Sequence, residues 1–409
     1  MQIQRRALLV GIDHYERIED LNWCVDDVFA LRHVLEKHEN REPNFSCHIL
    51  LGPKPAQHPQ LPEQCVNLSR LRSELETFFN FDGMVLFYFS GHGYQTEQGV
   101  YLVTQDGNPT LPGLSLKTLL KMANESPAQE VLLIIDSCFS GALGEPGTSQ
   151  VQEMENFYLR PGVTLLAASQ ANQKAHELEG SGMFTHLVIA ALKGGASDIR
   201  GHISAASIYG YVEQALGPWD QRPIYKSNAR QLSPVRYVAP DIKDEDLRQL
   251  PALFPTPDHH FYLAPTYEVT HALANPEHVA LFSLFKRYQV ARILRPSITQ
   301  DLYFAALNSR PVELTPLGQF YWRLAKSDLL GNAPAFQTSE RKAMPEPESV
   351  AKLFHEAYER LAPHFGYETR DATRVPWSEV PPDNKHLMIA VAAEVLAMLY
   401  APGETEPGP

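Results

Sequence analysis

Two short apolar runs, each followed directly by a glycine-containing loop, constrain the fold of this chain more than any other feature. Met84–Phe89 leads into the loop Ser90–Gly93 (Ser-Gly-His-Gly), and Val131–Ile135 leads into Asp136–Gly141 (Asp-Ser-Cys-Phe-Ser-Gly). Runs this short, and this rich in β-branched and aromatic residues, predict buried strands of a parallel sheet. Loops at the carboxyl ends of such strands are where an open α/β sheet binds its ligands. We therefore expect the histidine of the first loop and the cysteine of the second to meet at one edge of the sheet.

The rest of the first 230 residues alternates between strand-like and helix-like patterns. Apolar runs predict further strands over residues 7–12, 47–51, 101–104, 163–168 and 222–225. Apolar residues at helical spacing predict helices over residues 26–36, 68–79, 115–122, 184–192 and 204–216. Alternating strands and helices predict an α/β fold with a mostly parallel sheet flanked by helices on both faces.

Composition changes near residue 230, and the later part of the chain is predicted to be mainly α-helical. Residues 1–232 form the predicted α/β domain, and residues 233–265, with many prolines and charges, are typical of a linker or docking strap. Residues 266–335 are expected to form a helical domain with a winged-helix-like segment, in which Thr315 caps a helix ending near Leu330. A small helical domain is predicted over residues 345–402, followed by a disordered tail, residues 403–409.

Charge and cysteine usage exclude several functional classes. The formal net charge of −13 argues against a nucleic-acid partner. No apolar run approaches the roughly 18 residues of a membrane span, and the first residues do not have signal-peptide architecture. The four cysteines show no CxxC pairing, so neither a disulfide scaffold nor a zinc site is expected. We expect a cytoplasmic protein, in a reducing compartment that keeps a reactive thiol intact.

The two loops carry the residue types that thiol catalysis needs. A cysteine such as Cys138 attacks only as the thiolate, and a protonated imidazole such as that of His92 stabilises this form. Glycines in both loops allow sharp turns and close approach to a substrate. The backbone N–H groups of Gly93 and Cys138 are candidate oxyanion donors, each of a kind worth about 10²–10³ in rate. An isolated Cys–His pair is more often structural, but two glycine-rich loops that both follow buried strands favour catalysis.

These loops resemble the catalytic motifs of the caspase/metacaspase family of cysteine endopeptidases. The resemblance covers about residues 4–228 and includes four flanking segments, Gly11–Tyr15, Leu21–Asp27, Ala167–Gln170 and Gly182–Thr185. It implies a caspase-like sheet in which His92 and Cys138 form a catalytic dyad acting on protein or peptide substrates.

The residue two positions before the cysteine separates the branches of this family. The caspase signature has glutamine there, whereas this chain has Asp136, as in the metacaspase branch. The resemblance implies an acidic primary-specificity pocket built from Asp27, Ser90 and Asp136 with Cys24 beside them, and it places Ser169 in the substrate groove. Because a buried carboxylate forms a charge-assisted pair with a guanidinium, we expect hydrolysis after Arg, with Lys weaker. The alternative role for Asp27 is a helix N-terminal charge favoured by the macrodipole.

No cofactor or metal is expected from the sequence. Many metacaspases bind calcium through an acidic cluster downstream of the histidine. Here residues 94–108 hold only two carboxylates, Glu97 and Asp106. Calcium takes six to eight oxygen ligands, so calcium dependence is not expected.

The C-terminal half suggests regulation. The spacing of His355–Tyr358 and Val375–Pro381 resembles the small helical domain repeated in ryanodine receptors. We expect this half to bind an activating ligand or partner and release the protease; the alternative is a helical annex that only stabilises the enzyme.

The leading hypothesis is a caspase-like endopeptidase that cleaves after Arg in a bacterial signalling or defence pathway. The rival is a non-catalytic scaffold or sensor that uses the fold for protein interaction. A third hypothesis, DNA binding by residues 268–330, conflicts with the acidic balance of the chain.

Overall fold

A computed structural model describes residues 4–61, 65–137, 139–141, 158–168, 183–216, 223–230, 233–298, 301–331, 346–361 and 375–400. The chain divides into two compact units, Met1–Phe336 and Gln337–Pro409. None of the helices in the described residues has the length and apolarity needed to cross a membrane.

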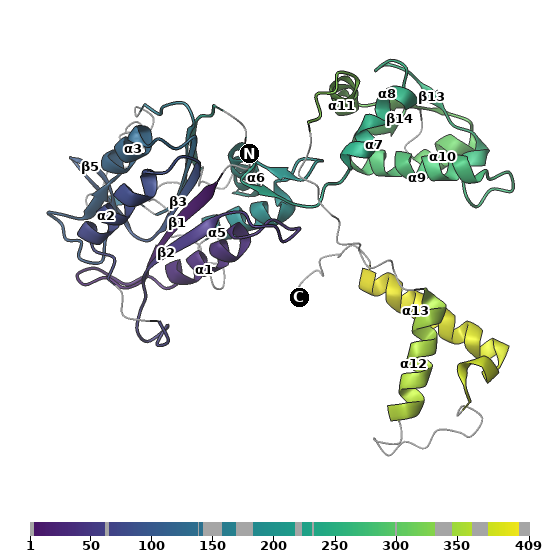
Figure 1. Ribbon diagram of the computed structural model, residues 1–409, viewed down its shortest axis with the longest axis horizontal. Coiled ribbons are helices and arrows are strands. Elements are labelled where there is room, and N and C mark those ends of the chain that lie inside the picture. The colour runs from purple at the N-terminus through teal and green to yellow at the C-terminus, as the bar shows by residue number, and fades with distance from the viewer. Residues whose placement is uncertain are drawn as a thin grey trace. The chain divides into compact units, whose positions relative to one another are not determined.

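A six-stranded sheet forms the centre of the first unit (Figure 1). Its strands, in spatial order, are β11 (Ile224–Asn228), β9 (Val163–Ala167), β7 (Glu130–Asp136), β3 (Met84–Ser90), β1 (Arg5–Ile12) and β2 (Ser46–Gly52). All neighbouring pairs are parallel except β11 with β9, which is antiparallel. The mostly parallel sheet expected from the sequence is therefore confirmed, with an antiparallel strand at one edge.

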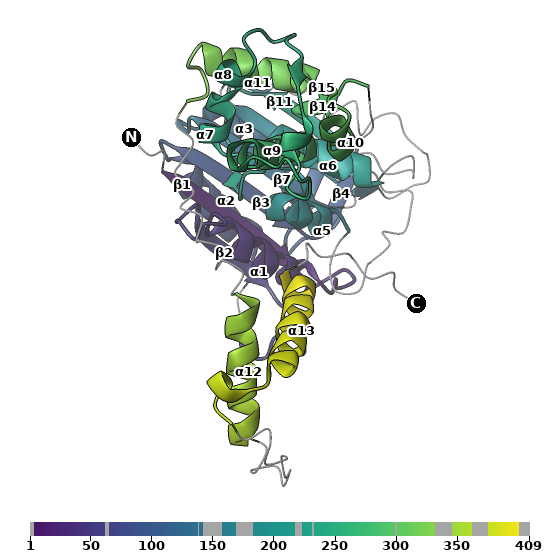
Figure 2. The same cartoon turned by 90° about the vertical axis from the view of Figure 1, so that its right-hand side faces the viewer.

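Helices cover both faces of this sheet (Figures 1 and 2). On one face lie α2 (Leu68–Phe79) and α3 (Leu116–Glu125); on the other lie α1 (Cys24–Leu35), α5 (Met183–Ala190) and α6 (Ala205–Leu216). Because successive strand residues point to opposite faces, β3 contributes to both layers of the core. Phe87 and Phe89 pack with the α2 and α3 layer, whereas Leu86 and Tyr88 pack with the α1 and α5 layer.

A second, four-stranded sheet was not expected as such from the sequence. Its order is β6 (Gly113–Ser115), β5 (Gly99–Val103), β4 (Gly93–Thr96) and β8 (Phe139–Gly141). The sequence predicts only one strand here, over residues 101–104. The other three strands are three or four residues long, and pairing with distant segments, rather than local pattern, determines them.

Residues 233–331 contain a three-stranded antiparallel sheet among short helices. They hold β12 (Arg236–Tyr237), which pairs with β10 (His202–Ile203), then α7 (Asp244–Arg248), α8 (Leu250–Leu253), β13 (Phe261–Tyr262), α9 (Pro276–Val290), β14 (Leu294–Pro296), α10 (Leu302–Leu307), β15 (Pro311–Leu314) and α11 (Pro316–Lys326). The order of this sheet is β13, β15, β14. Thr315 caps α11 as predicted, accepting the Gly318 N–H at 3.1 Å, but the helix ends at Lys326.

The segment expected to be a linker or docking strap, residues 233–265, supplies buried side chains. Val235 belongs to the core beneath the sheet, whereas Ile242 and Phe254 belong to the core of the module that follows. A bidentate pair between Arg200 and Asp244, with both N–O distances 2.8 Å, joins α7 to the α/β domain. The domain boundaries given above stay predictions.

The second unit contains a pair of helices, α12 (Pro347–Leu361) and α13 (Pro382–Tyr400). His355 on α12 is buried, and its Nε2 lies 2.8 Å from the carbonyl oxygen of Val375. Its ring contacts that of Trp377 at 5.8 Å between centroids. The two aromatic segments singled out in the sequence therefore pack together, while the likeness to ryanodine-receptor domains stays a prediction. The tail, residues 403–409, lies outside the described residues.

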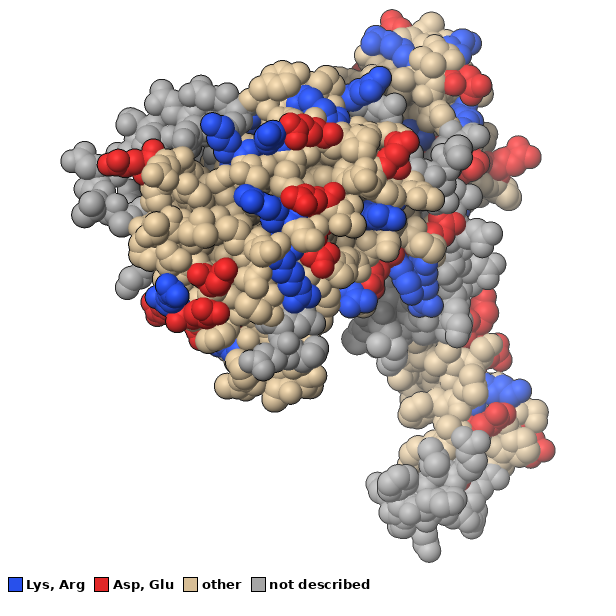
Figure 3. Space-filling view, turned by 60° about the vertical axis from the view of Figure 1, so that its left-hand side comes forward, with Lys and Arg blue, Asp and Glu red and all other residues tan. Residues whose placement is uncertain are grey.

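Acidic and basic side chains are interspersed over the face shown in Figure 3.

Candidate active site

The two motif loops leave neighbouring strands at the carboxyl edge of the main sheet. Ser90, the last residue of β3, pairs with Asp136, the last residue of β7. On the other side Ser90 pairs with Gly11 of β1. The Gly91 N–H donates to the Asp136 carbonyl at 3.3 Å, which ties the histidine loop to the end of β7. The topology thus brings the ends of β1, β3 and β7 to one edge, where the sequence places the site.

The chain then continues from both loops into the small sheet. Gly93 of β4 pairs in parallel with Phe139 of β8. Each of these residues directly follows one member of the predicted dyad in the sequence. Cys138 itself, and Ser169 of the predicted substrate groove, lie outside the described residues.

His92 is held at two points by the loop that follows β1. Its Nε2 lies 2.8 Å from the carbonyl oxygen of Glu19, and its backbone N–H donates to the hydroxyl of Tyr15 at 2.8 Å. The rings of Tyr15 and His92 are in contact, with centroids 4.9 Å apart. Because a carbonyl oxygen only accepts, Nε2 is the donor in this hydrogen bond, and Nδ1 is the ring nitrogen that does not take part in it.

The loop that holds His92 is itself fixed by two carboxylates. Asp20 accepts the Tyr15 N–H at 2.9 Å and pairs with Nδ1 of His14 at 3.1 Å. The fully buried Asp13 accepts the backbone N–H groups of Cys24 at 2.8 Å and Val25 at 3.3 Å. A residue outside α1 therefore serves as the cap that the first turn of this helix lacks locally.

Close packing brings the first turn of α1 against the end of β1. A Cβ atom on Gly11 would lie 2.3 Å from the carbonyl oxygen of Cys24 and 2.8 Å from Cγ2 of Val28. Only glycine permits this approach. The contact places two predicted pocket residues, Cys24 and Asp27, at the sheet edge that holds Ser90.

The predicted pocket residues surround the Cys24 thiol and affect its pKa. Burial raises the pKa of the Cys24 thiol well above its usual value, and the charges on Asp13, Asp27 and Asp136 raise it further. A hydrogen bond to Ser90 opposes these effects. Cys24, Asp27 and Ser90 are buried, and Asp136 is half-buried. The Cys24 thiol therefore stays protonated at neutral pH. Cys24 packs beside the acidic residues and is not suited to act as a nucleophile.

Asp136 is supported from α5. Thr185 donates both its backbone N–H, at 3.3 Å, and its hydroxyl, at 2.6 Å, to Oδ2 of Asp136. Burial raises the pKa of Asp136, and the two hydrogen bonds from Thr185 oppose that effect. The balance leaves a carboxyl group that is harder to ionise than one in water.

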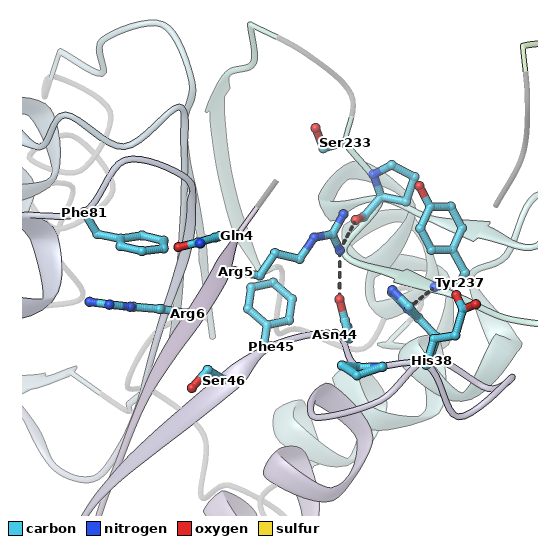
Figure 4. Close-up of a pocket in the computed structure, with 13 residues that line it drawn as sticks. Gln4, Arg5, Arg6, His38, Asn44, Phe45, Ser46, Phe81, Ser233 and Tyr237 are labelled. Atoms are coloured by element: carbon cyan, nitrogen blue, oxygen red, sulfur yellow. Dashed lines mark hydrogen bonds between the residues drawn. The ribbon is translucent and has the colours of Figure 1, made fainter. Parts of the chain in front are cut away.

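The larger of the two cavities described lies at the opposite edge of the sheet. It has a volume of about 720 Å³, and its lining includes Arg5, His38 and Tyr237, near the amino ends of β1 and β2 (Figure 4). Nη1 of Arg5 donates to Oδ1 of Asn44 at 2.8 Å and to the Pro234 carbonyl at 3.0 Å. Burial is the main reason that the pKa of His38 is lowered to about 4, and the nearby positive charge of Arg5 lowers it further. The side chains of Arg5 and His38 already form hydrogen bonds with neighbouring segments, so we assign this cavity a structural role. It lies at the end of the strands opposite to the motif loops.

Sequence reasoning assigned no role to four residues that shape the site. Tyr15 and Thr185 lie in segments quoted for the family resemblance, so a signal for them existed. Asp13 lies beside Tyr15 in the same segment. Glu19 acts through its backbone carbonyl, which leaves no trace in the identity of the side chain.

Comparison with known proteins identifies the family. The peptidase C14 model, described as the caspase domain, matches residues 4–234, more than half of the chain. Metacaspase-1 of Pyricularia oryzae is 28% identical over 184 residues, which are 41% of this chain and 45% of that protein. The chain thus spans less than half the length of this curated relative.

Two solved structures show weak likeness. Protein GSU0716 of Geobacter sulfurreducens is 15% identical with a TM-score of 0.42, over 57% of this chain and 99% of that one. Caspase-1 of Spodoptera frugiperda is 12% identical with a TM-score of 0.40, over 58% of this chain and 91% of that one. The chain belongs to the caspase-domain family of peptidases.

Proposed function

We propose that this protein is a cysteine endopeptidase that cleaves proteins after Arg, and more weakly after Lys, with His92 and Cys138 as its catalytic dyad. The observation that carries the proposal is the parallel pairing of Gly93 with Phe139, the residues that follow the dyad members. Paired neighbours on adjacent strands bring the preceding residues of each strand within reach of one another.

The hydrogen bond from Nε2 of His92 to the Glu19 carbonyl supports a role for Nδ1 as general base. Nδ1 accepts the proton of the Cys138 thiol, and the thiolate attacks the scissile carbonyl carbon. The backbone N–H groups of Gly93 and Cys138 stabilise the oxyanion. As the C–N bond breaks, His92 returns the proton to the leaving amine. Water then attacks the thioester with His92 again as base, which releases the acid and restores the thiol.

The acidic cluster supports selection of a basic side chain. Asp27 and Asp136 both act electrostatically on Cys24 and on Tyr88, so the two carboxyl groups face one small region. A guanidinium entering there gains charge-assisted hydrogen bonds, whereas a substrate aspartate meets like charge. Arg is favoured over Lys because its planar fork matches a carboxylate in two places.

The C-terminal region, in this proposal, regulates the peptidase by binding a ligand or protein partner. Exposed apolar side chains on α12, those of Leu353 and Phe354, support an interaction role over a purely stabilising annex. A cytoplasmic signalling or defence pathway is the proposed setting. A non-catalytic scaffold built on the same fold is the competing account.

Hydrolysis of matched fluorogenic peptides tests the proposal. The peptides carry Arg, Lys, citrulline or Asp before the scissile bond, and the proteins are the natural chain, Cys138→Ala and His92→Ala. We expect the order Arg, then Lys, with citrulline and Asp far below, and loss of hydrolysis in both variants. Cleavage that survives Cys138→Ala, or that prefers Asp, contradicts the proposal.

A further inference from the structure

Two buried hydroxyl groups form a hydrogen-bonded chain that leads from the middle of the sheet to the proposed specificity carboxylate of Asp136. Tyr88 on β3 and Thr185 on α5 are both completely buried. Their side-chain oxygens are 2.6 Å apart. The Thr185 hydroxyl is also 2.6 Å from Oδ2 of Asp136, and the Thr185 backbone N–H donates to the same atom at 3.3 Å.

The chemistry of the three groups fixes the direction of this chain. An ionised carboxylate only accepts, so the single hydroxyl proton of Thr185 goes to Asp136. The Thr185 oxygen can then only accept from Tyr88, whose phenol proton is the remaining donor. The order is therefore Tyr88 O–H to Thr185 O–H to Oδ2 of Asp136. Each bond polarises the next, which strengthens the final bond to the carboxylate.

We propose that Thr185 and Tyr88 are positioning residues for substrate specificity: their relay occupies Oδ2 of Asp136 and leaves Oδ1 for the guanidinium of the substrate. This inference rests on the proposed function, because it assigns a role within the same pocket. Two donors on one oxygen restrict rotation of the carboxyl group, so the substrate meets an acceptor already in place.

The relay also keeps Asp136 charged. Burial opposes ionisation of this carboxyl group, and hydrogen bonds from Thr185 favour it. Loss of the Thr185 hydroxyl therefore removes both the orientation and part of the negative charge that a basic substrate needs. Binding of a neutral substrate side chain depends neither on the orientation of the Asp136 carboxylate nor on its charge.

Isosteric variants separate this role from packing. Thr185→Val keeps the shape and removes the hydroxyl, Thr185→Ser keeps the hydroxyl, and Tyr88→Phe removes only the distal donor. The matched control is Thr164→Val on β9, because Thr164 is also buried and bonded through its hydroxyl, to Ser227 at 2.7 Å, near the start of the strand. Steady-state kcat and KM are measured with Arg and citrulline peptides of otherwise identical sequence.

We expect Thr185→Val to lower kcat/KM for the Arg peptide by about 10- to 100-fold more than for the citrulline peptide, mainly through KM, as for a hydrogen bond to a charged group. Thr185→Ser restores the Arg preference, Tyr88→Phe gives a smaller loss, and Thr164→Val leaves the ratio unchanged. Equal losses for both peptides, or an unchanged ratio in Thr185→Val, overturn the relay. If the natural chain does not prefer Arg to citrulline, the proposed function itself fails, which is a distinguishable result.

Discussion

The Nε2 atom of His92 lies 2.8 Å from the carbonyl oxygen of Glu19, so the backbone of a loop more than 70 residues away orients the imidazole. The same loop provides Tyr15, whose hydroxyl accepts the His92 N–H. His92 is therefore fixed through both its ring and its backbone before any substrate binds. Such preorganisation is what a general base needs to act without a further rearrangement.

Tyr15→Phe tests this support. The substitution removes the hydroxyl that accepts the His92 N–H but keeps the ring that packs against the imidazole. We expect kcat to fall by about tenfold with little change in KM, because the half-buried His92 N–H loses its partner and the proposed base loses its alignment. Stopped-flow or steady-state hydrolysis of the Arg peptide measures kcat and KM for the variant and for the natural chain. An unchanged kcat shows that Glu19 alone positions the ring.

The ionisation of Asp136 predicts a pH-dependent specificity. Burial raises the pKa of Asp136, so this carboxyl group gains its proton at a pH above the usual range for Asp. As the pH falls, kcat/KM for the Arg peptide should decline faster than that for the citrulline peptide. The ratio of the two kcat/KM values reports on the pocket alone, because titration of the dyad affects both peptides equally. A ratio that stays constant down to pH 4 contradicts the role of Asp136.

Asp13 should affect stability rather than chemistry. Its side chain accepts two backbone N–H groups at the start of α1, so Asp13→Ala is expected to lower the free energy of unfolding by about 1–3 kcal/mol. Asp13→Asn keeps a side-chain acceptor and should lower the free energy of unfolding by less. Urea unfolding measures both, and equal losses in the two variants would argue against the capping role.

The same residue gives a pH dependence with a defined sign. Burial raises the pKa of Asp13, so the folded protein binds this proton more tightly than the unfolded chain does. The stability contributed by the protonated form is present at low pH and is lost as the pH rises through the raised pKa. The stability of Asp13→Asn, measured relative to that of the natural chain, should therefore increase as the pH rises through the raised pKa of Asp13, because the amide cannot ionise.

Two glycine substitutions are expected to act in opposite directions. Gly11→Ala places a Cβ 2.3 Å from a backbone oxygen of α1, so the helix must shift, and we expect a loss of about 1–3 kcal/mol in stability with weaker binding of the Arg peptide. Gly210→Ala, on α6, meets nothing within 4 Å and should stabilise by about 0.5–1 kcal/mol. Thermal unfolding of both variants checks the pair. A tolerated Gly11→Ala would mean that α1 does not rest against β1 as described.

Strong local patterns made much of the fold predictable from the sequence. The boundaries of α2 and β3 agree to within one residue with the predicted segments 68–79 and 84–89, because a clear helical period and an unbroken apolar run mark them. The small sheet was missed because β4 and β8 owe their pairing to the loops that precede them. Residues 233–265 have the composition of a linker, yet Phe254 is fully buried, since packing against α9 overrides local composition.

The candidate site shows the same division. His92, Asp27, Ser90 and Asp136 could be named as candidates from the sequence because the proposed function assigns the chemistry to their side chains. Glu19 could not, because its contribution is a carbonyl group that every residue possesses. Thr185 lies in a segment singled out for its resemblance, but its role depends on the position of α5 beside β7, which only the tertiary structure gives.

Covalent labelling tests the central claim most directly. A peptidyl arginyl fluoromethylketone is incubated with the natural chain and with His92→Ala, and peptide mass spectrometry locates the adduct. We predict modification at Cys138 in the natural chain and little in the variant. Cys24 and Cys47 should stay unmodified because burial raises the pKa of both thiols, and Cys65, although exposed, also has a raised pKa that disfavours its reactive thiolate. An adduct on one of those three cysteines, or labelling of Cys138 that does not depend on His92, would contradict the account.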